Sequence, residues 1–149
     1  MCKQEIIKFI NNYKETDDFT GGIDKSQIEF AQNELGLEFP DSYKWFLSTY
    51  GSGGLFGVDI EGVTQSYKHS VVATTMRFRD LGMNKDLIVI EDIDEYAYCL
   101  RASDMEKFEC PVIAWNKIGG LDDYEAAKNF CQFLWYRLQD AREAWEEDY

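Results

Sequence analysis

The sequence has 149 residues, 45% of them hydrophobic, and this suits one folded domain over residues 1–149. The formal net charge of −13 argues against free nucleic acid as a partner, because phosphate binding needs a positive surface. The longest aliphatic run, residues 87–90, is far shorter than the ~20 residues that span a bilayer, and the N-terminus lacks a signal-peptide apolar region. We therefore expect a cytoplasmic protein that makes no membrane contact.

Apolar residues at three- and four-residue spacing predict helices over residues 2–14, 24–35, 40–50, 71–81 and 123–146. The second helix has the best-marked start, because Asp24 and Gln27 form a capping box, and Gly36 can end it in the left-handed conformation. The last helix is expected to start near Asp122, with Glu125 in the same capping pattern.

Strands are expected where β-branched, aromatic and aliphatic residues gather between turns, over residues 55–60, 87–92, 96–101 and 110–116. Within 96–101, alternation places Tyr96, Tyr98 and Leu100 on one face and Ala97 and Cys99 on the other. The spacing of these segments predicts an α+β fold with a central, mainly antiparallel sheet flanked by helices.

A glycine-rich segment over residues 51–54 raises the question of phosphate binding. Phosphate-binding loops place their glycines before a helix, whereas these glycines follow a helix and precede a predicted strand. The spacing of these glycines matches neither the dinucleotide-binding motif nor the P-loop motif. We therefore expect scaffold residues rather than a small-molecule site at Pro40, Tyr43, Trp45, Phe46, Gly51, Gly53 and Gly54.

No motif in the sequence indicates catalysis. The four cysteines lack CxxC spacing, so we expect reduced, buried or incidental thiols rather than a zinc site. The one histidine, His69, lies in a polar stretch and is expected to be an exposed loop residue. We expect no catalytic residues, no cofactor and no metal, and therefore a protein that is not an enzyme.

Acidic residues gather over 91–95, and three interpretations stay open: a cation site, a solvated turn, or a patch that faces a partner. The cluster lacks the glycine-bent loop and downstream glutamate of an EF-hand. Asp59 and Glu61 would share a face if 55–61 were extended.

Acidic residues also end the last predicted helix, against its dipole, which disfavours each acid by typically ~0.3–1 kcal/mol. This arrangement fits either an uncritical, fraying end or contact with a basic group. For a protein partner, the expected contact residues are, in order, Asp92, Asp94 and Glu95, then Asp59 and Glu61, then Trp145, Glu146 and Glu147.

An ordered series of short matches carries a family resemblance. It comprises Leu35-Gly36, Phe39-Pro40, Ser42-Tyr43-Lys44, Phe46-Leu47, Tyr50-Gly51, Gly53-Gly54, Val89-Ile90-Glu91-Asp92, Tyr98-Cys99-Leu100 and Cys110-Pro111-Val112. The series resembles the SUKH superfamily, which includes the Smi/Knr cell-wall regulators of fungi, and is most similar to YobK-type antitoxins of bacilli.

The resemblance implies a single α+β domain without general catalytic residues. Bacterial members are commonly immunity proteins that bind and neutralise a cognate polymorphic toxin domain, often a nuclease, and YobK-type members are similar to antitoxins of LXG-type toxins. Together with the acidic charge of this sequence, the resemblance predicts a basic nuclease toxin domain as the partner. A non-catalytic protein-binding regulatory module in a larger assembly, as in the fungal relatives, is the alternative.

Overall fold

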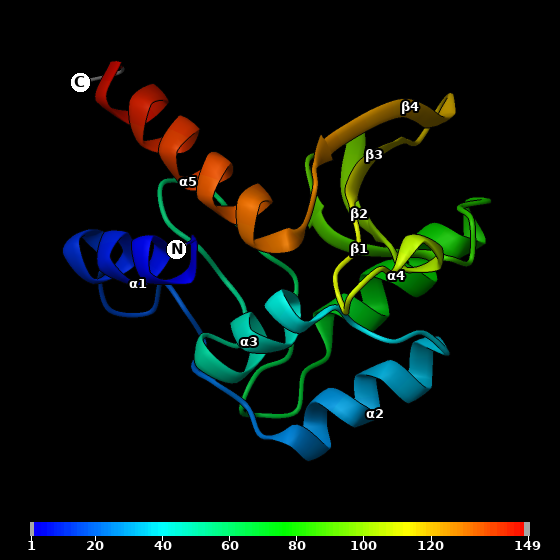
Figure 1. The fold of residues 1–149 in the computed structure, drawn as a ribbon, viewed down its shortest axis with the longest axis horizontal. Helices are drawn as coiled ribbons and strands as arrows, with labels where there is room; N and C mark the ends of the chain where they lie inside the picture. Colours follow the sequence, from blue (N-terminus) through cyan, green and yellow to red (C-terminus); the bar gives the residue numbers. More distant parts are fainter. Residues whose placement is uncertain (1, 148–149) are drawn as a thin grey trace.

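The computed structural model describes residues 2–147, and for residues 120–123 and 147 it describes the backbone alone. The elements in this part of the chain are, in order, α1 (Cys2–Tyr13), α2 (Lys25–Leu35), α3 (Asp41–Thr49), α4 (Ser70–Asp80), β1 (Leu87–Asp92), β2 (Tyr96–Arg101), a 3-10 turn (Ala102–Asp104), β3 (Val112–Asn116), β4 (Gly120–Ala127) and α5 (Phe130–Glu147) (Figure 1). The four strands form one sheet in the order β1-β2-β3-β4, with every neighbouring pair antiparallel. The predicted α+β class is confirmed.

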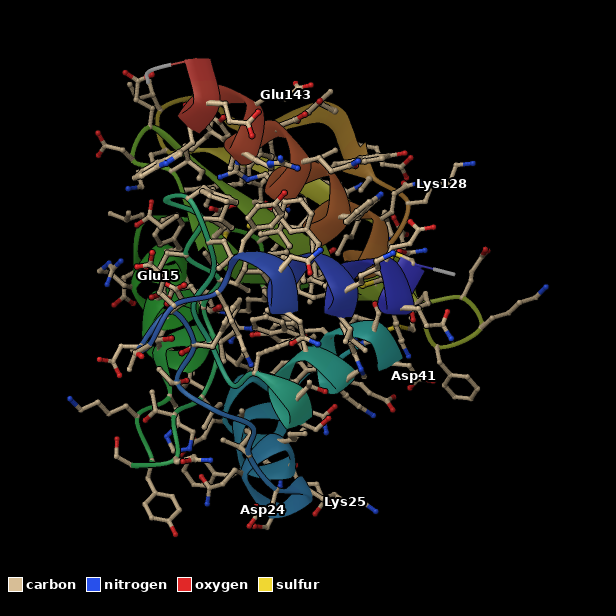
Figure 2. The ribbon with its side chains drawn as sticks, turned by 90° about the vertical axis from the view of Figure 1, so that its left-hand side faces the viewer. Glu15, Asp24, Lys25, Asp41, Lys128 and Glu143 are labelled. Atoms are coloured by element: carbon tan, nitrogen blue, oxygen red, sulfur yellow. A yellow bond between two sulfur atoms is a disulfide. The ribbon has the colours of Figure 1, made fainter. Side chains whose placement is uncertain are left out.

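Different helices cover the two faces of the sheet. One face packs against α4 and forms the smaller core, made of Phe78, Met83, Leu87, Val89, Ala97, Cys99, Ile113 and Trp115. Alternate strand residues on the other face join the larger core, to which α1, α2, α3 and α5 contribute. Figure 2 looks onto α1, with α5 on one side of it and α3 on the other. Alternate residues of β2 belong to the two different cores, so the predicted alternation in this strand is confirmed.

A β-bulge in β1 changes the direction of its last side chains. The pairing with β2 shifts between Val89 and Glu91, so that Glu91 lies opposite Tyr98 and Asp92 lies opposite Ala97. Because directly paired residues share a face, Glu91 points toward α5, whereas Asp92 points toward α4. Regular alternation would have exchanged these two carboxylates.

The strand predicted over 55–60 is wrong. Val58 N donates to Leu55 O at 2.9 Å, and both Phe56 (φ 54°) and Gly57 (φ 89°) adopt the left-handed conformation. This turn folds the segment back so that Ile60 forms a single bridge with Gly53 rather than an extended strand. The premise that put Asp59 and Glu61 on one face is therefore wrong as well.

The predicted start of the last helix is also wrong, because residues 120–127 form the edge strand β4 beside β3. The helix begins at Phe130, where the side chain of Asn129 accepts a 2.9 Å hydrogen bond from Gln132 N. Two acceptable cap patterns lie seven residues apart, and pairing with β3 decides against the one at Asp122.

The glycine-rich segment is part of the scaffold. Tyr43, Phe46 and Leu47 of α3 are fully buried, as expected. The backbone amides of residues 51–54 all donate to backbone carbonyls within the fold, which leaves none of them for a phosphate. At Gly51 (φ 77°), an added Cβ would lie 2.1 Å from the carbonyl oxygen of Gly21, so a side chain is excluded by both conformation and space.

The expectation of four reduced thiols is wrong for one pair. Cys2 at the start of α1 and Cys131 at the start of α5 form a disulfide, with their Cα atoms 6.2 Å apart. Cys99 and Cys110 are free and buried. The pairing escapes sequence reasoning because the two residues lie 129 positions apart and become neighbours only when α1 packs on α5.

Candidate protein-binding surface

The chain segment 59–61 is held against the end of β1. Glu61 N donates to Ile90 O at 2.8 Å, and Asp59 N approaches Glu91 Oε2 at 3.4 Å. The buried hydroxyl of Tyr43 donates to the carbonyl oxygen of Glu61 at 2.6 Å. The scaffold helix α3 thereby helps to hold the backbone of this segment beside the acidic end of the strand.

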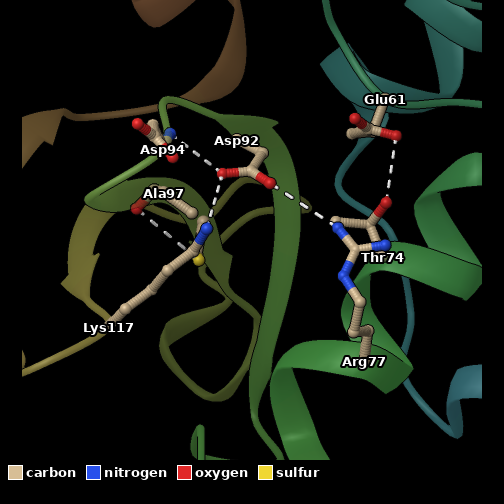
Figure 3. A network of polar contacts seen from close by, with 8 residues as sticks. Glu61, Thr74, Arg77, Asp92, Asp94, Ala97 and Lys117 are labelled. Atoms are coloured by element: carbon tan, nitrogen blue, oxygen red, sulfur yellow. Dashed lines mark hydrogen bonds and ion pairs between the residues drawn. The ribbon is translucent and has the colours of Figure 1, made fainter. Parts of the chain in front are cut away.

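Asp92 lies between two cations (Figure 3). Its Oδ2 is 3.5 Å from Arg77 Nη2 of α4, and its Oδ1 is 3.3 Å from Lys117 Nζ after β3. Oδ1 also accepts a 3.1 Å hydrogen bond from Asp94 N, which closes a tight turn with Asp94 at φ 80°. The turn leaves the side chains of Asp94 and Glu95 exposed.

These carboxylates form one surface, here called the acidic ridge: Asp59, Glu61, Asp92, Asp94 and Glu95. Partial burial raises the pKa of Glu61; hydrogen bonds from Ser70 and Thr74 oppose the rise, and the charges of Asp59 and Asp92 add to it. The hydrogen bond from Glu61 N to Ile90 O, two residues before Asp92, places these sequence-distant groups close in space. The structure thus brings together the first two groups of predicted contact residues, although not by the route expected from the sequence.

Glu91, from the same acidic run, is not part of the ridge. Its carboxylate is 2% exposed and accepts two hydrogen bonds from Arg137 of α5, at 2.7 and 2.8 Å. Sequence reasoning missed this pair because the bulge that turns Glu91 inward leaves no local signal. The only available clue was the position of Glu91, directly after the aliphatic run 87–90.

The third group of predicted contact residues lies at the end of α5. Glu146 has a basic partner within its own helix, Arg142 Nη2 at 2.9 Å. The half-exposed Trp145 ring lies 6.0 Å from Phe56, centroid to centroid. The side chain of Glu147 lies outside the described part of the structure.

Among the described residues, no three His, Cys, Asp or Glu side chains are grouped so that they could hold a metal ion. His69 is half-buried rather than exposed: its Nε2 lies 3.0 Å from Gln27 Oε1, and its ring lies 4.7 Å from that of Phe30. None of the helices in this part of the chain is long and apolar enough to cross a bilayer.

Comparison with known proteins identifies a similar structure and a family. A crystal structure of a protein from Pseudomonas syringae pv. tomato is similar, with a TM-score of 0.70 at 18% sequence identity, over 91% of this chain and 95% of that one. The profile of the SUKH_5 family, described as SMI1-KNR4 cell-wall, matches residues 4–139, which include the whole acidic ridge and leave out the end of α5. The chain therefore belongs to the SMI1-KNR4 cell-wall family, SUKH_5.

Proposed function

We propose that this protein is an immunity protein that binds and neutralises a basic toxin domain, a nuclease of an LXG-type toxin, in the cytoplasm. The observation that carries the proposal is the acidic ridge. Five carboxylates from two chain segments gather there, and the described side chains within 4 Å of them supply two cations, Arg77 and Lys117. Family membership is compatible with this role.

A ridge of this kind suits the substrate groove of a nuclease. Such grooves are lined by Lys and Arg, because they bind phosphates. Carboxylates at fixed positions can occupy the same cations, and complementary charge accelerates association through long-range steering. Inhibition of this kind needs no catalytic residue in the inhibitor.

The backbone that carries the ridge is held in place before a partner binds. Asp92 is fixed by Arg77 and Lys117, and the backbone of Glu61 is fixed by Tyr43. A rigid surface loses less conformational entropy on binding than a mobile one. The exposed carboxylates of Asp59, Asp94 and Glu95 are then the groups available to a partner, whereas Asp92 mainly positions the turn.

The test is co-expression with an LXG-type nuclease toxin domain, scored by cell survival. The ridge variant Asp59→Lys/Glu95→Lys changes two exposed residues and leaves the ion pairs of Asp92 intact. We expect it to lose protection and to associate with the toxin on the order of tenfold more slowly at low salt. The difference should shrink as salt rises, because exposed charges are screened beyond ~8 Å at physiological ionic strength.

A control with the same change in net charge is Glu34→Lys/Asp80→Lys, at exposed positions of α2 and α4 outside the ridge. It should protect cells as the native protein does. Equal loss in both variants would show that net charge matters rather than the ridge. Absence of protection by the native protein, together with capture of a non-toxin assembly, would favour the regulatory module instead.

A further inference from the structure

A surface hollow lined by aromatic residues lies beside the turn at residues 55–57, which precedes the ridge segment 59–61 in the chain. Its volume is about 260 Å³, and Tyr13, Phe56 and Trp145 line it together with the acidic residues Glu15 and Asp18. The ring centroids of Tyr13 and Phe56 are 5.6 Å apart, and those of Phe56 and Trp145 are 6.0 Å apart. These five residues are called the aromatic groove below.

Three separate parts of the chain build the groove: the end of α1 with the loop after it, the turn at 55–57, and the last turns of α5. Figure 2 shows Glu15 just beyond α1 and Glu143 on α5. Glu15 N donates to Asp18 Oδ2 at 2.6 Å, which holds this carboxylate in place. Phe56 is placed there by a left-handed backbone conformation (φ 54°), which is unfavourable for a residue with a side chain.

The fold already stacks one cation on this aromatic group. The guanidinium of Arg142 lies 4.5 Å from the centroid of Tyr13 and forms an ion pair with Glu146 at 2.9 Å. Aromatic faces beside carboxylates are the chemistry that binds a guanidinium, whose planar group stacks on rings while it donates to acidic oxygens. Phe56 and Trp145 line the same hollow as the acidic residues Glu15 and Asp18.

We infer that the aromatic groove takes an arginine side chain of the basic protein partner, as a second contact beside the acidic ridge. The identity of that partner rests on the proposed function. Phe56 in the groove precedes Asp59 on the ridge by three residues, so their Cα atoms are at most about 11 Å apart, within the reach of one protein partner. Arginine is preferred over lysine because a compact ammonium cannot stack as a planar guanidinium does.

The test uses the whole chain, labelled with ¹⁵N, and the peptide Ac-Gly-Arg-Gly-NH₂ followed by NMR. The expected result is a shift of the Trp145 indole N–H signal and of the amides of residues 13–18 and 55–57. A peptide with citrulline, which has nearly the same shape without the charge, should cause no such shift. The lysine peptide should bind several-fold more weakly than the arginine peptide.

Two variants separate a binding role from a structural one. Trp145→Ala and Phe56→Gly should each weaken arginine-peptide binding by about tenfold. Glycine accepts the left-handed conformation at position 56, so Phe56→Gly removes the ring without straining the turn. Tyr67→Gly is the matched control, because Tyr67 is also an exposed aromatic residue at positive φ (64°) but lies outside the groove. Its binding should equal that of the native protein.

Equal shifts with the citrulline peptide, shifts confined to the ridge, or unchanged binding by both groove variants would overturn the inference. These results do not involve the toxin, so they leave the proposed function standing. In a second experiment, each variant is expressed together with the toxin at a level at which the native protein only just protects, and cell survival is compared. Full protection by Trp145→Ala and Phe56→Gly, with loss in the ridge variant, would overturn the groove as a partner contact. Peptide binding at the groove, with no protection by the native chain, would overturn the immunity role alone.

Discussion

Arg137 holds Glu91 through two hydrogen bonds, Nε to Oε1 at 2.7 Å and Nη2 to Oε2 at 2.8 Å, and so connects α5 to β1. Glu91 is almost fully buried, whereas Arg137 keeps a quarter of its side chain exposed. The hydrogen bonds to Glu91 raise the pKa of Arg137, against the opposing effect of burial. Each side chain therefore needs the other as a partner, because a buried charge without one would destabilise the fold.

Removing one member of this pair should be costly, because it leaves the other charge buried and unpaired. Glu91→Ala and Arg137→Ala should each lower the free energy of unfolding by about 3 kcal/mol, and the double variant should lose much less than the sum. Urea denaturation of the four proteins measures this coupling. The exposed pair Lys25–Glu29 is the control, and Lys25→Ala should change stability by less than ~0.5 kcal/mol. Additive losses at Glu91 and Arg137 would contradict the prediction.

Two glycines with similar backbone conformations should respond differently to alanine. Gly36 (φ 68°) has no atom within 4 Å of an added Cβ, so Gly36→Ala should cost only the ~1 kcal/mol penalty of the left-handed region. Gly51→Ala should cost clearly more, because its Cβ would also meet the carbonyl oxygen of Gly21 at 2.1 Å. Thermal unfolding of both variants, at one protein concentration, checks the ranking. Equal costs would mean that the 51–54 segment relaxes easily.

Glu61 should give a pH-dependent change in stability. Its folded-state pKa lies above the usual 4.5, chiefly because of partial burial, so the folded protein holds this proton more tightly than the unfolded chain does. The charged carboxylate therefore destabilises the fold at neutral pH, and this cost disappears as the pH falls below 4.5. Glu61→Gln should raise the urea midpoint at pH 7, and the gain should be lost near pH 4. The exposed Glu34→Gln should show neither effect.

The Cys2–Cys131 disulfide should stabilise the folded state by restricting the unfolded chain, since it closes a loop of nearly the whole sequence. Cys131→Ser should lower the free energy of unfolding by about 3 kcal/mol, within the 2–4 kcal/mol typical of such crosslinks. Dithiothreitol should lower the melting temperature of the native protein and leave that of Cys131→Ser unchanged. A native protein that melts identically with and without reductant would show that the bond contributes nothing.

Local signals in the sequence were sufficient for most elements. Asp24 caps α2 as predicted, with its carboxylate accepting from Gln27 N, and Gly36 ends the helix in the left-handed conformation. Both signals act within one helical turn and need no tertiary contact. The segment at 55–60 failed for the opposite reason, because the left-handed conformation of Phe56 is one that its residue type disfavours.

The candidate binding surface, too, could be predicted only in part from the sequence. Asp94 and Glu95 follow a strand end, and their exposure could be predicted from the turn. The approach of Asp59 and Glu61 to Asp92 depends on hydrogen bonds from Asp59 N and Glu61 N to β1, which no spacing reveals. Whether these residues bind a partner stays a prediction.

The bulge between Val89 and Glu91 has a consequence for how this protein can diversify. It shifts the phase of the pleat by one position and so decides which of the two adjacent acids faces α5 and which faces α4. A change at 91 acts on the contact between α5 and the sheet, whereas a change at 92 acts on the ion pairs with Arg77 and Lys117. Substitutions at the exposed Asp94 and Glu95 can change the surface charge while the interior stays as it is.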